Sequence, residues 1–164
     1  MAMPEKDNFL GNWDREFQTT LKVLKAFPIN NQDYRPHKKS RSAKELAWTF
    51  VVEEQMAVNG LLSGKMDFEN MPKPPASMKD VISTYEKSHK GVMNKLKKAN
   101  ESAYNKTIKF FVAPKKMADF RRMDVLWMFL MDTIHHRGQF SVYLRMAGGK
   151  VPSIYGPSAD EPWD

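Results

Sequence analysis

The chain has 164 residues, of which 41% are hydrophobic and 27% charged, and it contains no cysteine. These values are typical of one globular domain rather than a disordered or membrane-spanning chain, and the lack of cysteine excludes disulfides, thiolate nucleophiles and cysteine-ligated zinc. The formal net charge is +7, but aromatic residues are not interleaved with the basic ones, so we expect a solvated basic surface and no nucleic-acid partner.

The N-terminal stretch MAMPEKDNF has neither the basic start nor the apolar segment of a secretory signal, and we therefore expect a cytoplasmic protein without membrane attachment. The first predicted helix runs from about Lys6 to Phe27 and is ended by Pro28. Its apolar residues recur at spacings of three and four, the pattern of a helix with one buried face. They are Phe9, Trp13, Phe17, Leu21 and Leu24.

The second predicted helix begins after Ser42, because Ser42 and Glu45 have the spacing of a capping box. It continues to about Leu62 and stops near Gly64. The proline-rich stretch KMDFENMPKPPA that follows, residues 65–76, is longer than a tight antiparallel turn requires. The connection is therefore long enough to cross the end of a bundle and join two parallel neighbours.

Ser77 offers a cap for a third helix, whose apolar stripe extends from Val81 to Leu96. Residues 102–115 are less regular, and the stretch KTIKFFVAP could be extended. A fourth helix is predicted from about Met117 to Met146, ended by two glycines. Four long amphipathic segments without a convincing series of strands predict an all-α fold, a four-helix bundle.

Acidic side chains enter the apolar side of the second helix. With 100° per residue, Glu53 falls beside or within the arc formed by Leu46, Phe50 and Ala57, and Thr49 lies next to it. A carboxylate that faces a core must be paired, metal-bound or protonated, because burying it alone costs several kcal/mol. The alternative is a slightly rotated helix on which Glu53 reaches solvent or a lysine.

The fourth helix carries a polar block in the middle of an apolar run. Asp132 and His136 are one turn apart, and Gln139 and Tyr143 prolong the same stripe. Two such side chains can reach one cation, and Glu53 on another helix could complete the site. A buried hydrogen bond between Asp132 and His136 explains the spacing equally well.

Two further polar residues have structural interpretations. His89 lies on the apolar face of the third helix, and we interpret it as a core histidine with satisfied ring nitrogens rather than a ligand. Arg137 lies about 140° around the helix from Asp132. We therefore expect Arg137 to make a structural contact or an interface ion pair rather than to take part in chemistry.

Three stretches resemble the DinB-like family, also called DinB/YfiT: SRSAKELAW (40–48), DTIHHRGQFSVYLRMAG (132–148) and VPSIYGPSADE (151–161). The resemblance implies a four-helix bundle with up-down-down-up topology and a long link between its second and third helices. It implies one domain over residues 1–164, with an irregular tail, 148–164, packed on the bundle. Members of the family typically bind a divalent metal through three histidines.

Only one of those three ligand positions carries a histidine here, His136. Asp132 stands at the second position and Thr49, a poor ligand, at the third. In one interpretation Glu53 replaces the missing histidine, and a Glu53, Asp132 and His136 set holds Ni, Zn, Mn or Fe, the harder ions being favoured. In the other the site is metal-free, and the same side chains with Thr49 form a hydrogen-bonded cluster below a pocket.

The resemblance further implies a metal-dependent enzyme that acts on a small molecule. The activities it implies are those of a thiol-transferase or a hydrolase, and the implied partner is a low-molecular-weight thiol. Glu53 would then be a ligand or general base, and Gln139 and Tyr143 would donate hydrogen bonds in the pocket. The alternative is a non-catalytic binding or stress-response protein. A homodimer is also implied, with Trp48, Trp127 and the methionine-rich face of the fourth helix as an apolar patch unless these fill the core.

Overall fold

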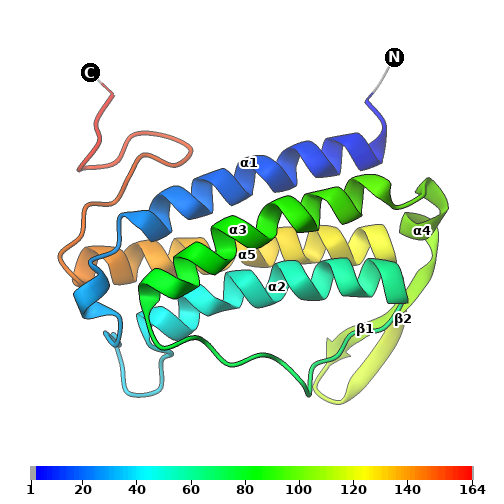
Figure 1. Cartoon of the computed structure of the whole chain (residues 1–164), viewed down its shortest axis with the longest axis horizontal. Helices are drawn as coiled ribbons and strands as arrows, with labels where there is room; N and C mark the ends of the chain where they lie inside the picture. Colours follow the sequence, from blue (N-terminus) through cyan, green and yellow to red (C-terminus); the bar gives the residue numbers. More distant parts are fainter. Residues whose placement is uncertain (1–2, 164) are drawn as a thin grey trace.

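Four long helices form a bundle in the computed structural model, which describes residues 3–163. In Figure 1, the first and last long helices run in one direction and the middle two in the other, so the predicted up-down-down-up topology is confirmed. The four helices are α1 (Glu5–Lys25), α2 (Ala43–Ser63), α3 (Met78–Lys98) and α5 (Arg122–Met146). A short 3₁₀ turn, η1 (Ile29–Asn31), follows α1.

The link between α2 and α3 makes these two helices parallel neighbours. Residues 64–77 leave the end of α2 and return along the bundle to its other end, where α3 begins (Figure 1). Helix α2 then packs against α3 and α5, and α1 packs against the same two helices from the other side. The prediction that the long link joins parallel neighbours is confirmed.

The predicted caps fix where α2 and α3 begin. The Ser42 hydroxyl accepts from the Glu45 amide at 3.2 Å, and the Glu45 carboxylate accepts from the Ser42 amide at 2.7 Å, a complete capping box. At α3, the Ser77 hydroxyl accepts from the Asp80 amide at 3.1 Å. Both side chains satisfy amides that have no partner within the helix.

Helix α2 ends at Gly64, whose φ of 74° lies in the left-handed region. A side chain there would be strained, and its Cβ would also collide with the Arg122 guanidinium. That guanidinium donates a hydrogen bond of 2.5 Å to the carbonyl oxygen of Leu61 in the last turn of α2.

Gly64→Ala is therefore expected to lower the free energy of unfolding by about 1–2 kcal/mol, measured by urea denaturation. Gly91→Ala is the matched control, because Gly91 lies inside α3 with open space where its Cβ would be. The control should gain about 0.5–1 kcal/mol from higher helix propensity. Equal stability of the two variants would contradict the strain argument.

A β-hairpin precedes α5 and corrects the sequence prediction. Strand β1 (Thr107–Ala113) pairs with β2 (Lys116–Arg121) after the short helix α4 (Glu101–Asn105). The prediction that a helix begins near Met117 is wrong, because residues 117–121 belong to β2. Their apolar spacing continues smoothly into α5 and resembles a helical stripe. Pairing with the β-branched and aromatic residues of β1 outweighs that local pattern.

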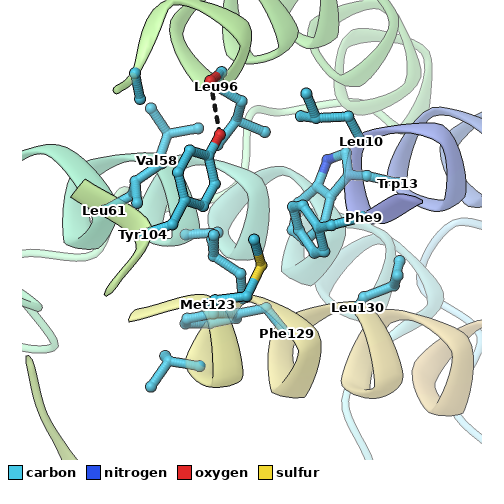
Figure 2. Close-up of a cluster of buried hydrophobic side chains, with 14 of the residues drawn as sticks. Phe9, Leu10, Trp13, Val58, Leu61, Leu96, Tyr104, Met123, Phe129 and Leu130 are labelled. Atoms are coloured by element: carbon cyan, nitrogen blue, oxygen red, sulfur yellow. Dashed lines mark hydrogen bonds between the residues drawn. The ribbon is translucent and has the colours of Figure 1, made fainter. Parts of the chain in front are cut away.

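The core consists of two hydrophobic clusters, one in each half of the bundle. Figure 2 shows part of the cluster near the hairpin, where Phe9 and Trp13 of α1 meet Phe129 of α5. In the same view the Tyr104 hydroxyl donates a hydrogen bond of 2.6 Å to the Leu96 carbonyl oxygen, which joins α4 to α3. The second cluster lies at the opposite end and includes Phe17, Phe27, Phe50, Tyr85 and Phe140.

Buried polar side chains lie between the two clusters on all four helices. Along α2, for example, the cluster at one end reaches Val51 and the other begins at Ala57, with Glu53 and Glu54 buried between them. Among residues 3–163, the buried polar residues other than the cap Ser42 are Glu16, Thr20, Glu53, Glu54, His89, Thr133 and Arg137. Of the polar block inside α5, Thr133 and Arg137 face this layer and His136 is half-buried at its edge, whereas Asp132, His135 and Gln139 are exposed.

Residues 148–163 contain no helix or strand and contact α1, where Lys22 forms an ion pair of 2.8 Å with Glu161. Residues 1, 2 and 164, which the single-domain prediction also covers, lie outside the described residues. Within residues 3–163, no helix is long and apolar enough to cross a membrane. Met131 and Met146 are exposed on α5, and a homodimer through this face stays a prediction.

Candidate metal centre

Three side chains from two helices meet at the edge of the polar layer. Glu53 of α2 and Asp132 and His136 of α5 each place one potential ligand atom within 4.8 Å of the other two. Glu53 Oε1 lies 3.0 Å from His136 Nδ1, and Asp132 Oδ1 lies 3.7 Å from the same nitrogen. The one-turn spacing on α5 and the inward position on α2 therefore converge as the sequence predicts.

Glu53 is buried, with 5% of its surface exposed. The alternative in which α2 rotates and Glu53 reaches solvent is therefore wrong. Its Oε2 accepts a hydrogen bond of 3.0 Å from the hydroxyl of Thr133, one residue after Asp132. This bond fixes the carboxylate and leaves Oε1 directed toward His136. Thr133 had no distinguishing signal in the sequence, because a threonine near a polar helix face is common.

His136 has a buried nitrogen without a hydrogen bond. Nδ1 lies 3.0 Å from Glu53 Oε1 without the alignment of a hydrogen bond, and its distance of 3.7 Å to Asp132 Oδ1 is too long for one. A buried polar atom without a partner is costly, whereas a cation placed among the three side chains would satisfy it. The donors present therefore fit a divalent metal ion.

The charges of the pair influence each other. Contact with the Glu53 carboxylate, assisted by Asp132, raises the pKa of His136 against the opposing effect of burial. Burial raises the pKa of Glu53, and His136 counteracts part of that rise. Asp132 differs from the other two because about half of its side chain is exposed. The centre is therefore buried on the α2 side and open to solvent at Asp132.

The other predicted site residues surround an open hollow of about 520 Å³ that also contains His136. Tyr143 lines it and donates a hydrogen bond of 3.1 Å to the backbone carbonyl oxygen of Arg41. Gln139 lines it too, and its side-chain nitrogen lies 2.9 Å from a ring nitrogen of the exposed His135. Neither Gln139 nor Tyr143 belongs to the group of three potential ligands.

Thr49 contacts Arg41 and not the three potential ligands that meet at His136. Its hydroxyl accepts a hydrogen bond of 2.8 Å from the Arg41 guanidinium and lies 3.3 Å from the carbonyl oxygen of Glu45. Arg41 lines the hollow beside His136. Sequence reasoning missed this arginine, because it lies in the irregular segment before α2, where no periodicity indicates the direction of a side chain.

A second buried polar group lies behind Glu53. The neighbouring Glu54 accepts a hydrogen bond of 3.1 Å from Trp13 and lies 2.6 Å from His89 Nδ1. His89 Nε2 lies 3.0 Å from Asp14. The interpretation of His89 as a satisfied core histidine is confirmed. Arg137 makes a structural contact, as predicted, in the form of a buried ion pair with Glu16 inside the bundle.

Comparison with known proteins is consistent with this architecture. The model of the DinB family matches residues 1–163. An uncharacterized protein, YrdA of Bacillus subtilis, is 26% identical over 163 residues, which cover 94% of this chain and 90% of that protein. A DinB-like protein from Bacillus cereus has a similar structure, with a TM-score of 0.76, 22% identity and coverage of 91% and 97% of the two chains. Another from Bacillus subtilis, YjoA, has a TM-score of 0.69, 19% identity and coverage of 87% and 93%.

Proposed function

The chain belongs to the DinB family, and from the geometry of its centre we propose that it is a metal-dependent enzyme that acts on a small molecule. Glu53, Asp132 and His136 would hold one divalent ion between α2 and α5. The observation that carries this proposal is the unpartnered, buried Nδ1 of His136, which lies close to two carboxylates. A cation is the simplest group that satisfies all three side chains at once.

The donor set favours particular ions. Two carboxylates and one imidazole suit manganese, iron(II) or nickel better than a closed structural zinc site, although zinc also accepts these ligands. Three protein ligands also leave coordination positions free for a substrate. The solvent-exposed side of Asp132 and the hollow beside His136 provide access to those positions.

A bound divalent ion would supply a Lewis acid that polarises a thiol or carbonyl group. The remaining roles belong to the chain itself. Thr133 holds the Glu53 carboxylate in place, which lets Glu53 serve as a ligand or a general base. Gln139 and Tyr143 line the hollow and would orient a bound substrate by hydrogen bonds. Thiol transfer and hydrolysis are the reactions to assay, with a low-molecular-weight thiol as the first substrate.

A metal-free binding protein is the competing function. Thr49 replaces the third histidine typical of the family and is bonded to Arg41, so this position offers no imidazole. The cationic Arg41 beside His136 also opposes a second cation. In that case the cluster would be a polar floor of a ligand pocket without turnover.

Metal content of tag-free protein separates the two functions. After incubation with manganese, iron(II), nickel or zinc and removal of excess ion, mass spectrometry should find about one ion per chain. Loss of either His136 or Glu53 by substitution with alanine should abolish binding, because two ligands hold an ion poorly. His135→Ala is the matched control, since His135 is the exposed neighbour outside the cluster.

Binding to the parent and to His135→Ala, but not to His136→Ala or Glu53→Ala, would support the metal centre. Circular dichroism of each variant checks that the bundle is intact. A parent that takes up none of the four ions would refute the metal-dependent enzyme and leave the binding protein. Equal loss in His135→Ala would show that the ion binds elsewhere on α5.

A further inference from the structure

The segment before α2 places an arginine at the edge of the hollow that contains His136. We propose that Arg41 is a specificity-determining residue that binds a carboxylate or phosphate group of the substrate. The substrate would thus be a small anion. This inference rests on the proposed function for the location of the reaction, and it adds the chemical class of the molecule.

Arg41 is held in position from both neighbouring helices. Thr49 of α2 accepts a hydrogen bond of 2.8 Å from the guanidinium Nη1, and Tyr143 of α5 donates a hydrogen bond of 3.1 Å to the Arg41 carbonyl oxygen. The Tyr143 bond holds the backbone of Arg41, and the Thr49 bond restricts its side chain, which is otherwise exposed. An arginine already restricted in this way loses less conformational entropy when it binds an anion.

The Arg41 guanidinium has donors left for a ligand. A guanidinium carries five N–H donors, and one Arg41 nitrogen is used in its bond to Thr49. Among residues 3–163, four other arginines have a carboxylate within 3.0 Å, whereas Arg41 has no carboxylate partner. The four paired arginines are Arg35, Arg121, Arg137 and Arg145.

The surroundings of Arg41 have the charge and shape that a small anion requires. Arg41 lines both the hollow beside His136 and an adjoining hollow of about 540 Å³. The second hollow also contains Arg35, Lys38 and Lys39, so its four basic side chains, Arg41 included, outnumber the single carboxylate of Glu45. Positive charges along a concave surface attract anions more strongly than the same charges on a flat one.

The wall of the second hollow favours a small ligand over a nucleic acid. Trp48 forms part of the wall, and its indole nitrogen donates a hydrogen bond of 2.6 Å to the Pro72 carbonyl oxygen in the α2–α3 link. The indole is thereby fixed within a single hollow. Single-stranded nucleic acids instead require a row of accessible aromatic platforms along a groove.

The position of Arg41 also gives it a role beside the metal. A divalent ion at His136 and the Arg41 guanidinium would repel each other, and an anionic group between them would relieve that repulsion. The metal and the anion should therefore bind cooperatively, each tightening the other by the same factor. The anionic group would point the rest of the substrate from the Arg41 edge toward the centre.

The test uses metal-free protein, so that it does not depend on the metal centre. Protein dialysed against EDTA is titrated with succinate and separately with inorganic phosphate, with sodium chloride added to a reference at equal ionic strength. The side-chain Nε–H signal of Arg41 is followed by ¹H–¹⁵N NMR. A saturable shift with a Kd of about 1 mM or tighter is expected for at least one anion. The two titrations distinguish a carboxylate from a phosphate ligand.

Three variants locate the bound anion, each followed through the Trp48 indole signal. Arg41→Gln should raise the Kd at least about tenfold, the loss typical of a charged hydrogen bond. The Kd of Arg41→Lys should lie between those of the parent and Arg41→Gln, because lysine keeps the charge but lacks the planar guanidinium. Lys116→Gln removes the same charge on the exposed β1–β2 hairpin, which lies away from the segment before α2 (Figure 1), and should leave the Kd unchanged.

No saturable shift with either anion, or equal weakening in Arg41→Gln and Lys116→Gln, would overturn the inference. Arg41-dependent binding of a DNA duplex without binding of succinate or phosphate would also overturn it. These outcomes are separate from the metal test. Metal binding without anion binding would support the proposed function and overturn this inference. Arg41-dependent anion binding by protein that never takes up metal would support this inference and overturn the proposed function.

Discussion

Arg137→Met should lower the free energy of unfolding by about 3–5 kcal/mol, the typical cost of removing one partner of a buried ion pair. Arg137 is 2% exposed, and its guanidinium lies 2.7 Å from the carboxylate of Glu16, which is 5% exposed. The same guanidinium contacts Thr20 and the hydroxyl of Tyr155 in the C-terminal tail. Methionine fills similar space, so the loss reports mainly the buried charge left on Glu16.

Urea denaturation measures this loss, and two further variants test its cause. Arg137→Met combined with Glu16→Leu removes both charges and should recover most of the stability, because a well-packed apolar pair can replace a buried ion pair. Arg145→Met removes an exposed arginine of the same helix, which pairs with Asp160 of the C-terminal tail, and its effect should be far smaller. If the double variant is as unstable as Arg137→Met, lost packing and not the unpaired charge is responsible.

The helices could be predicted from the sequence because their signals are local. The capping box at Ser42 and Glu45, the cap at Ser77 and the glycine at position 64 act within a few residues of the chain. The hairpin could not be predicted in the same way. Strand β2 forms because it pairs with β1, and its apolar residues continue the spacing of α5. Only the three-dimensional pairing decides between these two patterns.

The three potential metal ligands could be predicted from the sequence, whereas Arg41 could not. Asp132 and His136 follow from one helical turn, and Glu53 follows from its place on the apolar arc of α2. The position of Arg41 did not follow from the sequence, because the direction of a side chain in an irregular segment depends on tertiary contacts such as those from Thr49 and Tyr143. Irregular segments frequently carry functional residues for this reason.

The partners of His89, like the position of Arg41, could not be predicted from the sequence, because they come from two other helices. Glu54 of α2 and Asp14 of α1 lie at 2.6 Å and 3.0 Å from its two ring nitrogens, and Phe17 stacks on the ring with centroids 3.5 Å apart. His89 therefore joins three helices through one side chain.

His89→Leu should destabilise the protein by about 3 kcal/mol at neutral pH, because it leaves the buried Glu54 carboxylate with the single indole donor of Trp13. Burial already raises the pKa of Glu54, and the contact with His89 holds part of that rise back. Removal of His89 should raise the pKa of Glu54 further. The Glu54 carboxyl of the variant then has a higher pKa in the folded state than in the unfolded state. Its contribution to stability is complete below the unfolded pKa and is lost as the pH rises through the folded pKa.

The deficit of His89→Leu relative to the parent should therefore be larger at about pH 8 than at about pH 5, as measured by urea denaturation at both values. The double variant with Glu54→Gln provides the control, because glutamine keeps an oxygen for the Trp13 donor and cannot ionise. Its deficit should change much less with pH. An equal deficit at both pH values in the single variant would mean that lost stacking on Phe17, and not the charge of Glu54, accounts for the destabilisation.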